Sequence, residues 1–336
     1  MNSKKTVLPV FDLHCDLLAY LAENRERSPV DTDEIGCALP FLQEGNVKLQ
    51  VLAIYSPVEV GSSKFASKQG KIFGEILNNY DTYLTSVKDL DDLDGLTDGE
   101  KTGVVLAIEN AAGFCEEADS LKDGFKMLDN IAENMGPILY ISLTHHTENR
   151  FGGGNFSNNV GLKADGKSLL DYLDNRKIAV DLSHTSDALA HDIFEYTLQK
   201  NLDIPLLASH SNFRRVWQHP RNLPDEMAKE IIKRQGLIGM NFVRAFVNDK
   251  HPQALTDHIL CGLDLGAENS LCFGADFFYP GSHPDRSSRV PFFFEEHENA
   301  TKYSVILEEL KTQLSEKQLE GLAFRNALNF FKRIWS

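Results

Sequence analysis

The sequence lacks the features that attach a chain to a membrane or to nucleic acid. It contains no run of about 18 apolar residues, the length that a membrane span needs. Residues 1–5 are not followed by the apolar segment of a signal peptide, and residues 330–336 are too short and too charged for a lipid-anchor signal. Basic residues are outnumbered, with 34 Lys and Arg against 49 Asp and Glu and a net charge of −15. Such a chain is expected to bind neither nucleic acid nor an anionic membrane.

Cysteine is also scarce and scattered. The five cysteines are an odd number and include no CxxC pair, so they do not form the disulfide framework of a small secreted protein. A reducing compartment, the cytoplasm, is therefore the expected location. The remaining composition, 42% hydrophobic and 25% charged, is that of an ordinary globular protein with a sizeable core.

Eight short apolar segments rich in β-branched residues recur along the chain. They cover residues 6–14, 47–55, 103–109, 137–145, 178–184, 204–210, 237–243 and 270–277. Segments with helical spacing lie between them, for example 70–89, 165–176, 186–200, 224–235 and 253–266. Strands that alternate with helices indicate a parallel sheet.

The number of repeats favours one particular α/β fold. Eight units with strands that are apolar throughout predict a (β/α)8 TIM barrel of the metal-dependent hydrolase type, formed by residues 1–336 as a single domain. Residues 315–334 are expected to form one or two closing helices. A doubly wound open sheet also alternates strands and helices, but the chain has no GxGxxG motif to support that alternative.

Polar side chains gather where the predicted strands end. His14 and Asp16 form an i, i+2 pair, and the two side chains of such a pair on a strand point to the same face. Barrel enzymes build their sites from the C-terminal ends of strands. A helix cap or a turn would explain one polar residue at a strand end. Polar residues at six strand ends together indicate an active site. The residues are His14 and Asp16, Glu109, His145, His184, His210 and Asp276.

Five of these residues are sufficient for two metal ions. One zinc ion usually takes three protein ligands and a water, whereas five ligands with a bridging carboxylate suit a metal pair that shares a hydroxide. Imidazole and carboxylate donors favour Zn²⁺, with Mn²⁺, Co²⁺ and Fe²⁺ as alternatives. His145 and Asp276 then remain for an oxyanion or substrate and for the proton of the attacking water. The predicted ligands are His14, Asp16, Glu109, His184 and His210.

A series of short motifs, in their order and spacing, resembles the membrane (renal) dipeptidase family, peptidase family M19, among the amidohydrolase-like barrels. The resemblance extends from about Val10 to Asn326. The motifs are His14-Cys15-Asp16-Leu17, Glu109 after the third strand, Leu143-Thr144-His145, Asp181-Leu182-Ser183-His184, Ser209-His210-Ser211, Arg221-Asn222-Leu223-Pro224-Asp225 and Gly274-Ala275-Asp276-Phe277.

The resemblance implies a role for each matching residue. Two ligands would hold each metal and one carboxylate would bridge both. These are His14 and Asp16 for the first metal, His184 and His210 for the second, and Glu109 as the bridge. The other matches imply that His145 helps to bind the substrate, Arg221 holds the dipeptide carboxylate and Asp276 manages the proton of the attacking water.

Some positions depart from the family pattern. Asn110 and Ala111 stand where members often have Gly-Gly, and Phe278 follows Asp276-Phe277 where a second aspartate is common. The loop 146–154 is not of the usual Pro-Trp-Ala type, and His146 leaves open which of two adjacent histidines enters the site. These changes affect the expected substrate range more than the chemistry.

Residues 161–168 satisfy the GxxxxGK[ST] pattern of a phosphate-binding loop. A real P-loop follows a buried strand, and residues 154–160 do not have the composition of one. The preferred interpretation is a loop that leads into a helix. Nucleotide binding stays the alternative from a different class, together with a metal-free barrel that serves only as a binding module.

The expected function is a dipeptidase with two divalent metal ions, Zn²⁺ in first place. A metal-bridging hydroxide would attack the scissile carbonyl of a free dipeptide, including dipeptides with a C-terminal D-residue. Another barrel amidohydrolase, acting on a different amide or ester, is the alternative among enzymes. A homodimer is the expected assembly, and a small dipeptide is the expected partner.

Overall fold

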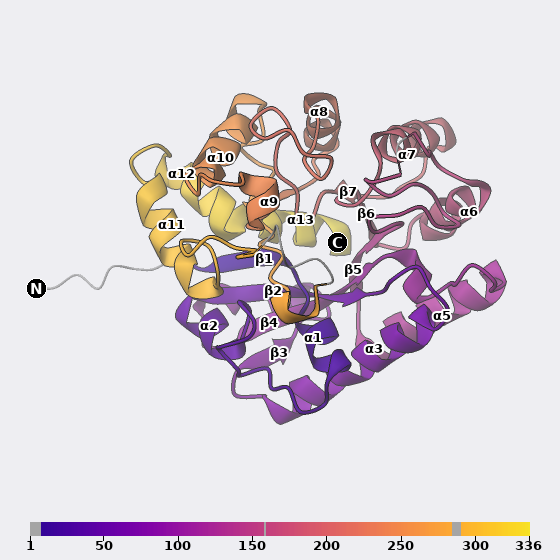
Figure 1. The fold of residues 1–336 in the computed structure, drawn as a ribbon, viewed down its shortest axis with the longest axis horizontal. Helices are drawn as coiled ribbons and strands as arrows, with labels where there is room; N and C mark the ends of the chain where they lie inside the picture. Colours follow the sequence, from indigo (N-terminus) through magenta and orange to yellow (C-terminus); the bar gives the residue numbers. More distant parts are fainter. Residues whose placement is uncertain (1–7, 158, 284–289) are drawn as a thin grey trace, which may run out of the picture.

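Eight parallel strands form a barrel at the centre of the computed structural model, which describes residues 8–157, 159–283 and 290–336 (Figure 1). Their order around the barrel is β7-β6-β5-β4-β2-β1-β9-β8. A parallel bridge between Ala208 and Ile238 joins the two ends, where Ala208 N donates to Leu237 O at 2.8 Å. The predicted barrel is confirmed. The strands are β1 Val10–Cys15, β2 Val47–Tyr55, β4 Thr102–Glu109, β5 Ile138–Ser142, β6 Ala179–Asp181, β7 Leu206–Leu207, β8 Ile238–Met240 and β9 Leu271–Phe273.

Helices surround the barrel on the outside. Several have local signals at their ends: the Ser186 side chain accepts from Leu189 N at the start of α7, and Asn201 ends that helix in the left-handed conformation (φ 53°). The helices are α1 Leu17–Glu23, α2 Leu39–Glu44, α3 Ser62–Asn79, α4 Leu90–Leu93, α5 Leu121–Met135, α6 Ala164–Leu173, α7 Asp187–Lys200, α8 Asp225–Lys233, α9 Arg244–Val247, α10 Ala254–Asp264, α11 Tyr303–Leu310, α12 Glu316–Glu320 and α13 Asn326–Trp335.

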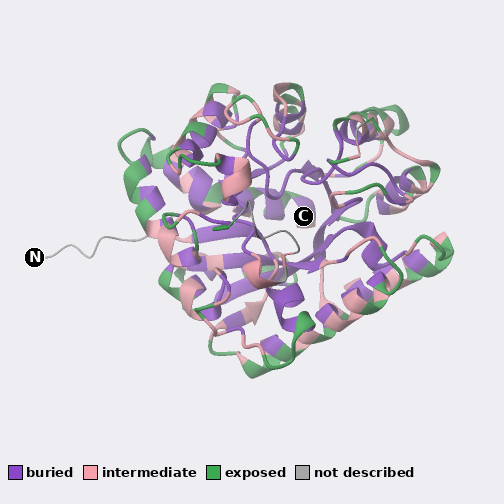
Figure 2. Ribbon diagram, viewed as in Figure 1, coloured by how far each residue is buried: buried purple, intermediate pink, exposed green. Residues whose placement is uncertain are grey.

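The core has two layers, one on each side of the strands, and Figure 2 colours most of the strand residues as buried. An outer layer lies between the strands and the surrounding helices, as in other barrels. An inner layer fills the barrel with side chains such as Phe11, Val105 and Leu139, and it continues into Phe331 of α13. Because Lys177 Nζ, just before β6, donates to the carbonyl of Trp335 at 3.1 Å, α13 lies at the N-terminal ends of the strands. That end of the barrel is closed, so the opposite end remains for a site.

Several predicted boundaries were wrong. The strands after β4 end up to several residues earlier than predicted, because side chains near the barrel mouth take over backbone hydrogen bonds. The helix expected over 70–89 is α3, Ser62–Asn79, since the buried stripe includes Ala66 as well as Phe73 and Ile76. Residues 84–86 instead form β3, Leu84–Ser86, which pairs with β4 outside the barrel path. The closing helices over 315–334 are confirmed as α12 and α13, joined by a π-helical turn.

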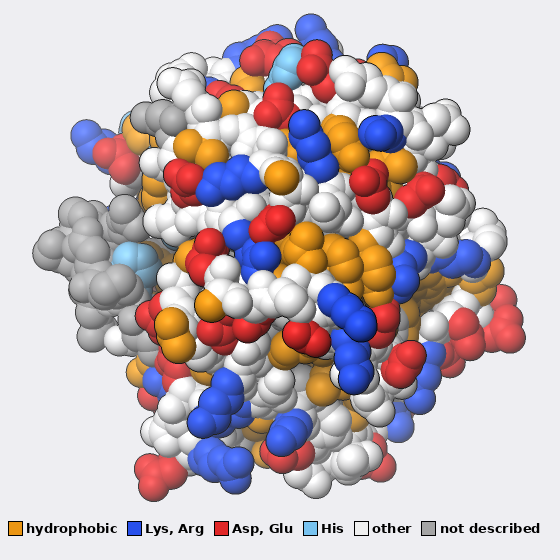
Figure 3. All heavy atoms as spheres, turned by 90° about the vertical axis from the view of Figure 1, so that its right-hand side faces the viewer, with side chains coloured by type: hydrophobic (Ala, Val, Ile, Leu, Met, Phe, Trp, Pro, Cys, Tyr) orange, Lys and Arg blue, Asp and Glu red, His pale blue; other side chains and the backbone are white. Residues whose placement is uncertain are grey.

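The surface shown in Figure 3 mixes Lys and Arg with Asp and Glu side chains, and no large area of one sign dominates it. This face carries no basic patch of the kind that nucleic acid requires. None of the helices in the described ranges is long and apolar enough to cross a membrane.

The packing of α13 against the inner core layer, at the closed end of the barrel, gives a prediction about stability. Phe331 is fully buried in the inner layer. Replacing it with alanine (Phe331→Ala) should lower the free energy of unfolding by about 3–5 kcal/mol, because it removes apolar contacts and leaves a cavity. Urea denaturation followed by circular dichroism measures the change. Leu198→Ala, on a side chain that is 73% exposed, is the control and should change little. Equal urea midpoints for the two variants would show that Phe331 does not stabilise the closed end of the barrel.

Candidate active site

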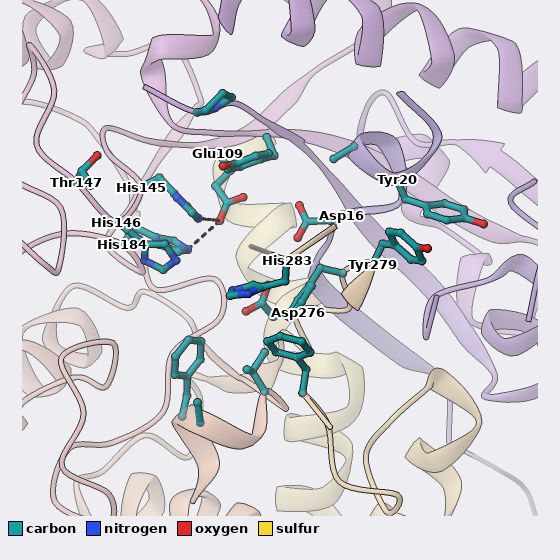
Figure 4. A pocket seen from close by; sticks show the side chains of 18 of the residues that line it. Asp16, Tyr20, Glu109, His145, His146, Thr147, His184, Asp276, Tyr279 and His283 are labelled. Atoms are coloured by element: carbon teal, nitrogen blue, oxygen red, sulfur yellow. Dashed lines mark ion pairs between the residues drawn. The ribbon is translucent and has the colours of Figure 1, made fainter. Parts of the chain in front are cut away.

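A cavity of about 500 Å³ opens at the C-terminal ends of the strands (Figure 4). That volume is in the usual range for a small-molecule site. One wall carries Glu109, His145 and His184, and the opposite side carries Asp16 and Tyr20. Aromatic side chains from the segments after β8 and β9 complete the lining.

The predicted site residues all lie at this edge of the barrel. Glu109 is the last residue of β4, and Asp16 lies between β1 and α1. Four others follow just beyond the ends of β5, β6, β7 and β9, namely His145, His184, His210 and Asp276. The loops that carry them, not the strands themselves, therefore aim these side chains.

One oxygen of Glu109 is the centre of the cluster. Its Oε1 lies 2.8 Å from His184 Nε2, 3.5 Å from His210 Nε2 and 3.7 Å from His14 Nε2. His145 Nε2 is 3.9 Å from the same oxygen. Imidazole nitrogens from four different strand ends thus converge on one carboxylate.

Two overlapping groups share this carboxylate. Glu109, His184 and His210 form one set of potential ligand atoms, all within 4.8 Å of one another. His14, Asp16 and Glu109 form the second set. The structure therefore brings the five predicted ligands together with Glu109 common to both groups, and their binding of metal stays a prediction.

The donor atoms of this cluster fit a divalent cation. His14 Nε2 and Asp16 Oδ1 are buried and have no hydrogen-bond partner within the described residues. Buried polar atoms are normally satisfied, so orphaned atoms at a cavity need an explanation such as an ion. An imidazole nitrogen and a carboxylate oxygen are the ligands that Zn²⁺-class ions prefer.

The protonation of the histidines supports the same fit. Burial, together with the charge of the Arg221 guanidinium, lowers the pKa of His14 to about 3. Burial likewise holds the pKa values of His184 and His210 well below the usual range. These imidazoles are neutral near pH 7, so each offers a lone pair to a cation.

The carboxylates repel one another. Burial raises the pKa of Glu109 well above its usual range, and the charges of Asp16 and Asp276 raise it further. Burial also raises the pKa of Asp276 to about 7, while Arg221 and a hydrogen bond from Asn241 oppose the rise. A bound cation would relieve this repulsion and the cost of burial together.

Neighbouring hydroxyls fix the tautomer of two histidines. Tyr140 Oη donates to Leu13 O at 2.8 Å, so its oxygen accepts from His14 Nδ1 at 2.7 Å. Ser209 Oγ donates to Asp181 Oδ2 at 2.8 Å and accepts from His210 Nδ1 at 2.6 Å. In both rings the proton is on Nδ1, and the Nε2 lone pair faces the cluster.

Two buried aspartates shape the loops; the sequence analysis gave a role to neither, and named Asp181 only as part of a motif. Asp12 Oδ1 accepts from His14 N at 2.9 Å, and Asp181 Oδ1 accepts from Ser183 N at 3.2 Å. Such side-chain bonds to the backbone two residues on replace ladder bonds and turn the chain. The signal in the sequence was a carboxylate inside an apolar strand, which must find donors when it is buried.

Backbone conformation explains one departure from the family pattern. Asn110, which stands where Gly is common, has φ 78°, a region that favours Gly and tolerates Asn. Its amide group bonds Ser56 O at 2.8 Å and Asn149 at 2.9 Å, so the side chain also ties the loop after His145 to the loop after β4. Asp276 also has a positive φ, 64°, at the cavity wall.

The remaining predicted residues are placed differently. Asp276 Oδ1 lies 3.7 Å from His14 Nε2, while Asn241 donates to its Oδ2 at 2.8 Å. His145 and His146 both line the cavity. Arg221 lies behind the cavity wall and is 2% exposed; it donates to Ser183 O and to His210 O. Its Nε has no hydrogen-bond partner among the described residues, and its role stays a prediction.

The P-loop pattern does not form a phosphate site. Among residues 154–157 and 159–160, one isolated bridge is present but no strand. Leu162 N donates to Asp192 Oδ2 at 2.8 Å, so a carboxylate lies where a phosphate would have to bind.

The tautomer argument gives a prediction about metal affinity. Tyr140→Phe removes the hydroxyl that accepts from His14 and should weaken Zn²⁺ binding by about 10–100-fold. Competition with a chromophoric chelator measures the affinity. Tyr172→Phe removes a hydroxyl that bonds Asp129 on α5, outside the cavity lining, and is the control. Unchanged affinity in the Tyr140 variant would show that this hydroxyl does not orient the ligand.

Comparison with known proteins gives relatives for this fold and site. An uncharacterized dipeptidase of Schizosaccharomyces pombe is 27% identical over 205 residues, which is 58% of this chain and 46% of that protein. A second uncharacterized dipeptidase of the same yeast is 26% identical over 208 residues, again 46% of its length. The chain thus spans about half the length of these curated relatives.

Solved structures share the fold across nearly the whole chain. A crystal structure described as a dipeptidase of peptidase family M19 has a TM-score of 0.83 at 18% identity, covering 98% of this chain and 99% of that one. A metallopeptidase from Rhodobacter sphaeroides, liganded with a phosphinate mimic of the dipeptide L-Ala-D-Ala, has a TM-score of 0.81 at 18% identity, covering 98% and 100%.

A sequence profile of the family described as membrane dipeptidase (peptidase family M19) matches residues 4–335. With this match and the barrel described above, the chain belongs to the membrane dipeptidase family, peptidase family M19.

Proposed function

We propose that this chain is a zinc-dependent dipeptidase that hydrolyses the peptide bond of free dipeptides. The observation that carries the proposal is the convergence of His14, His184 and His210 on one oxygen of Glu109 at the wall of the cavity. The family and the ligand of the Rhodobacter sphaeroides relative support a dipeptide substrate, including one with a C-terminal D-residue.

Five residues would hold two divalent ions. Zn²⁺ suits the mixture of neutral imidazoles and carboxylates. When bound, paired ions of this kind polarise a carbonyl and activate water for attack. The holding residues are His14 and Asp16, His184 and His210, and Glu109 between the pairs.

The other residues of the site would bind the substrate and move a proton. Asn241 holds Oδ2 of Asp276, which leaves Oδ1 to accept the proton of the attacking water and to return it to the leaving amine. His145, with a side chain 20% exposed to the cavity, would donate to the developing oxyanion. That Arg221 holds the α-carboxylate stays a prediction from the family resemblance, since its guanidinium is buried behind the cavity wall beside the cluster. A cytoplasmic location and a homodimer stay predictions from the sequence.

Metal removal and substrate length test the proposal together. The purified protein should contain about two Zn²⁺-class ions per chain, lose activity with a chelator and regain it with Zn²⁺. Free dipeptides should be cleaved, and their C-terminal amides poorly, because the amide carries no α-carboxylate. Elemental analysis and a chromatographic assay measure both properties. Full activity without metal would contradict the metal dependence. Equal rates on a dipeptide and its amide would contradict the recognition of the α-carboxylate.

The role of Asp276 can be separated from metal binding. Asp276→Asn keeps the size and tolerates the positive φ but cannot accept a proton. It should keep both metals and lower kcat by about 10²–10⁴-fold with little change in KM. Steady-state kinetics with elemental analysis measure the effect, and Asp171→Asn, at a surface carboxylate that bonds Tyr196, is the control. Loss of a metal would show that Asp276 is a ligand, and normal turnover would show that it is a bystander.

A further inference from the structure

One cationic residue lines the cavity. Arg244 is the only Lys or Arg among the described residues that line it, whereas several carboxylates line it, including Glu23 and Asp249. Arg244 is the first residue of α9, and its backbone N donates to Phe292 O at 2.8 Å. An antiparallel bridge between Val243 and Phe293 holds the same segment. The fold therefore fixes the base of this side chain at the wall of the cavity.

Arg244 has no carboxylate partner among the described residues. To the described residues its guanidinium makes one long hydrogen bond, from Nη2 to Val290 O at 3.5 Å. Other arginines of the chain are paired, such as Arg214 with Asp187 at 2.6 Å and Arg234 with Glu230 at 2.8 Å. A guanidinium at a cavity that makes only one long hydrogen bond is suited to bind a carboxylate, which it can do in a bidentate manner.

The place of Arg244 differs from that of Arg221. Arg221 donates to Ser183 O and His210 O, beside the metal cluster. The guanidinium of Arg244 instead reaches Val290 O, in the segment after β9, and bonds none of the described residues of the cluster. In a dipeptide the α-carboxylate is attached to the carbon next to the scissile nitrogen, so it must bind near the cluster. A carboxylate that reaches further is one at the end of a side chain.

The surroundings of Arg244 suit the apolar part of a substrate side chain that ends in a carboxylate. Phe246, Phe278 and Phe292 line the cavity together with it. Apolar walls that end in a single cation suit methylene groups that end in a carboxylate. We propose that Arg244 is a specificity-determining residue that pairs with the side-chain carboxylate of an acidic dipeptide. This inference rests on the proposed function and names the substrate class of the same site.

Glu and Gln dipeptides test the inference, because the two side chains have the same shape and differ in charge. Ala-Glu is compared with Ala-Gln, and Glu-Ala with Gln-Ala. The wild type should prefer Glu at one of the two positions by about tenfold or more in kcat/KM, since a hydrogen-bonded charge pair is lost with Gln. Arg244→Gln should bring that ratio close to one, and Arg244→Glu should favour Lys at the same position. The control Arg215→Gln changes an exposed arginine that pairs with Asp225 outside the cavity lining, and it should keep the wild-type ratio.

Affinity gives a readout that does not depend on turnover. Isothermal titration of the four dipeptides into the metal-loaded Asp276→Asn protein, with and without Arg244→Gln, should show the same Glu-to-Gln preference and its loss. A wild type without this preference, or an Arg244→Gln variant that keeps it, would overturn the inference. An equal loss for all free dipeptides and none for their C-terminal amides would also overturn it, because Arg244 would then bind the α-carboxylate. Absence of hydrolysis alongside a normal binding preference would instead count against the proposed function only.

Discussion

The structure depends on the burial of Glu109 among imidazoles at the end of the barrel. A carboxylate that is 3% exposed, with two further carboxylates close enough to raise its pKa, is costly to bury. The neighbouring histidines are neutral, so they do not compensate its charge. The nearest compensation from the chain is Arg221, which lies behind the wall. A cation bound in this cluster would compensate the charge of the carboxylates and accept the lone pairs of the imidazoles, which is why we interpret it as a metal centre.

The two ends of the barrel have different roles in bringing the site residues together. At the N-terminal ends of the strands, α13 and the inner core layer close the barrel with apolar side chains. At the C-terminal ends, Asp12 and Asp181 turn the chain and bond the residues beside the ligands. Asp12 also accepts from Tyr303 of α11 at 2.5 Å and from Ala275 N at 2.8 Å, next to Asp276. The Asp12 carboxylate thus joins β1, the segment after β9 and α11. The same hydrogen bonds hold these elements together and position the residues next to the site.

The sequence was informative where the signal is local or periodic. Glu109 and the histidines stand out because each ends an apolar segment, and parallel strands in a barrel bring such ends together whatever the exact boundaries are. The interactions that orient them are not local. Tyr140 and His14 are 126 residues apart, and Tyr303 and Asp12 are 291 apart, so no spacing rule links either pair. Residues 84–86 were assigned to a helix because their pairing with β4 is a tertiary contact that overrides local pattern. Arg244 gave no signal, since only the folded cavity distinguishes it from a surface arginine.

Anomalous X-ray diffraction at the zinc absorption edge, on crystals grown with Zn²⁺, tests the metal centre most directly. The account predicts two peaks that share Glu109, one beside His14 and Asp16 and the other beside His184 and His210. The exposed group His191, Asp192 and Glu195 on α7 is an internal comparison, because it also holds potential ligand atoms within 4.8 Å of one another. A peak at that surface group without any at Glu109, or no peak at all, would contradict the account.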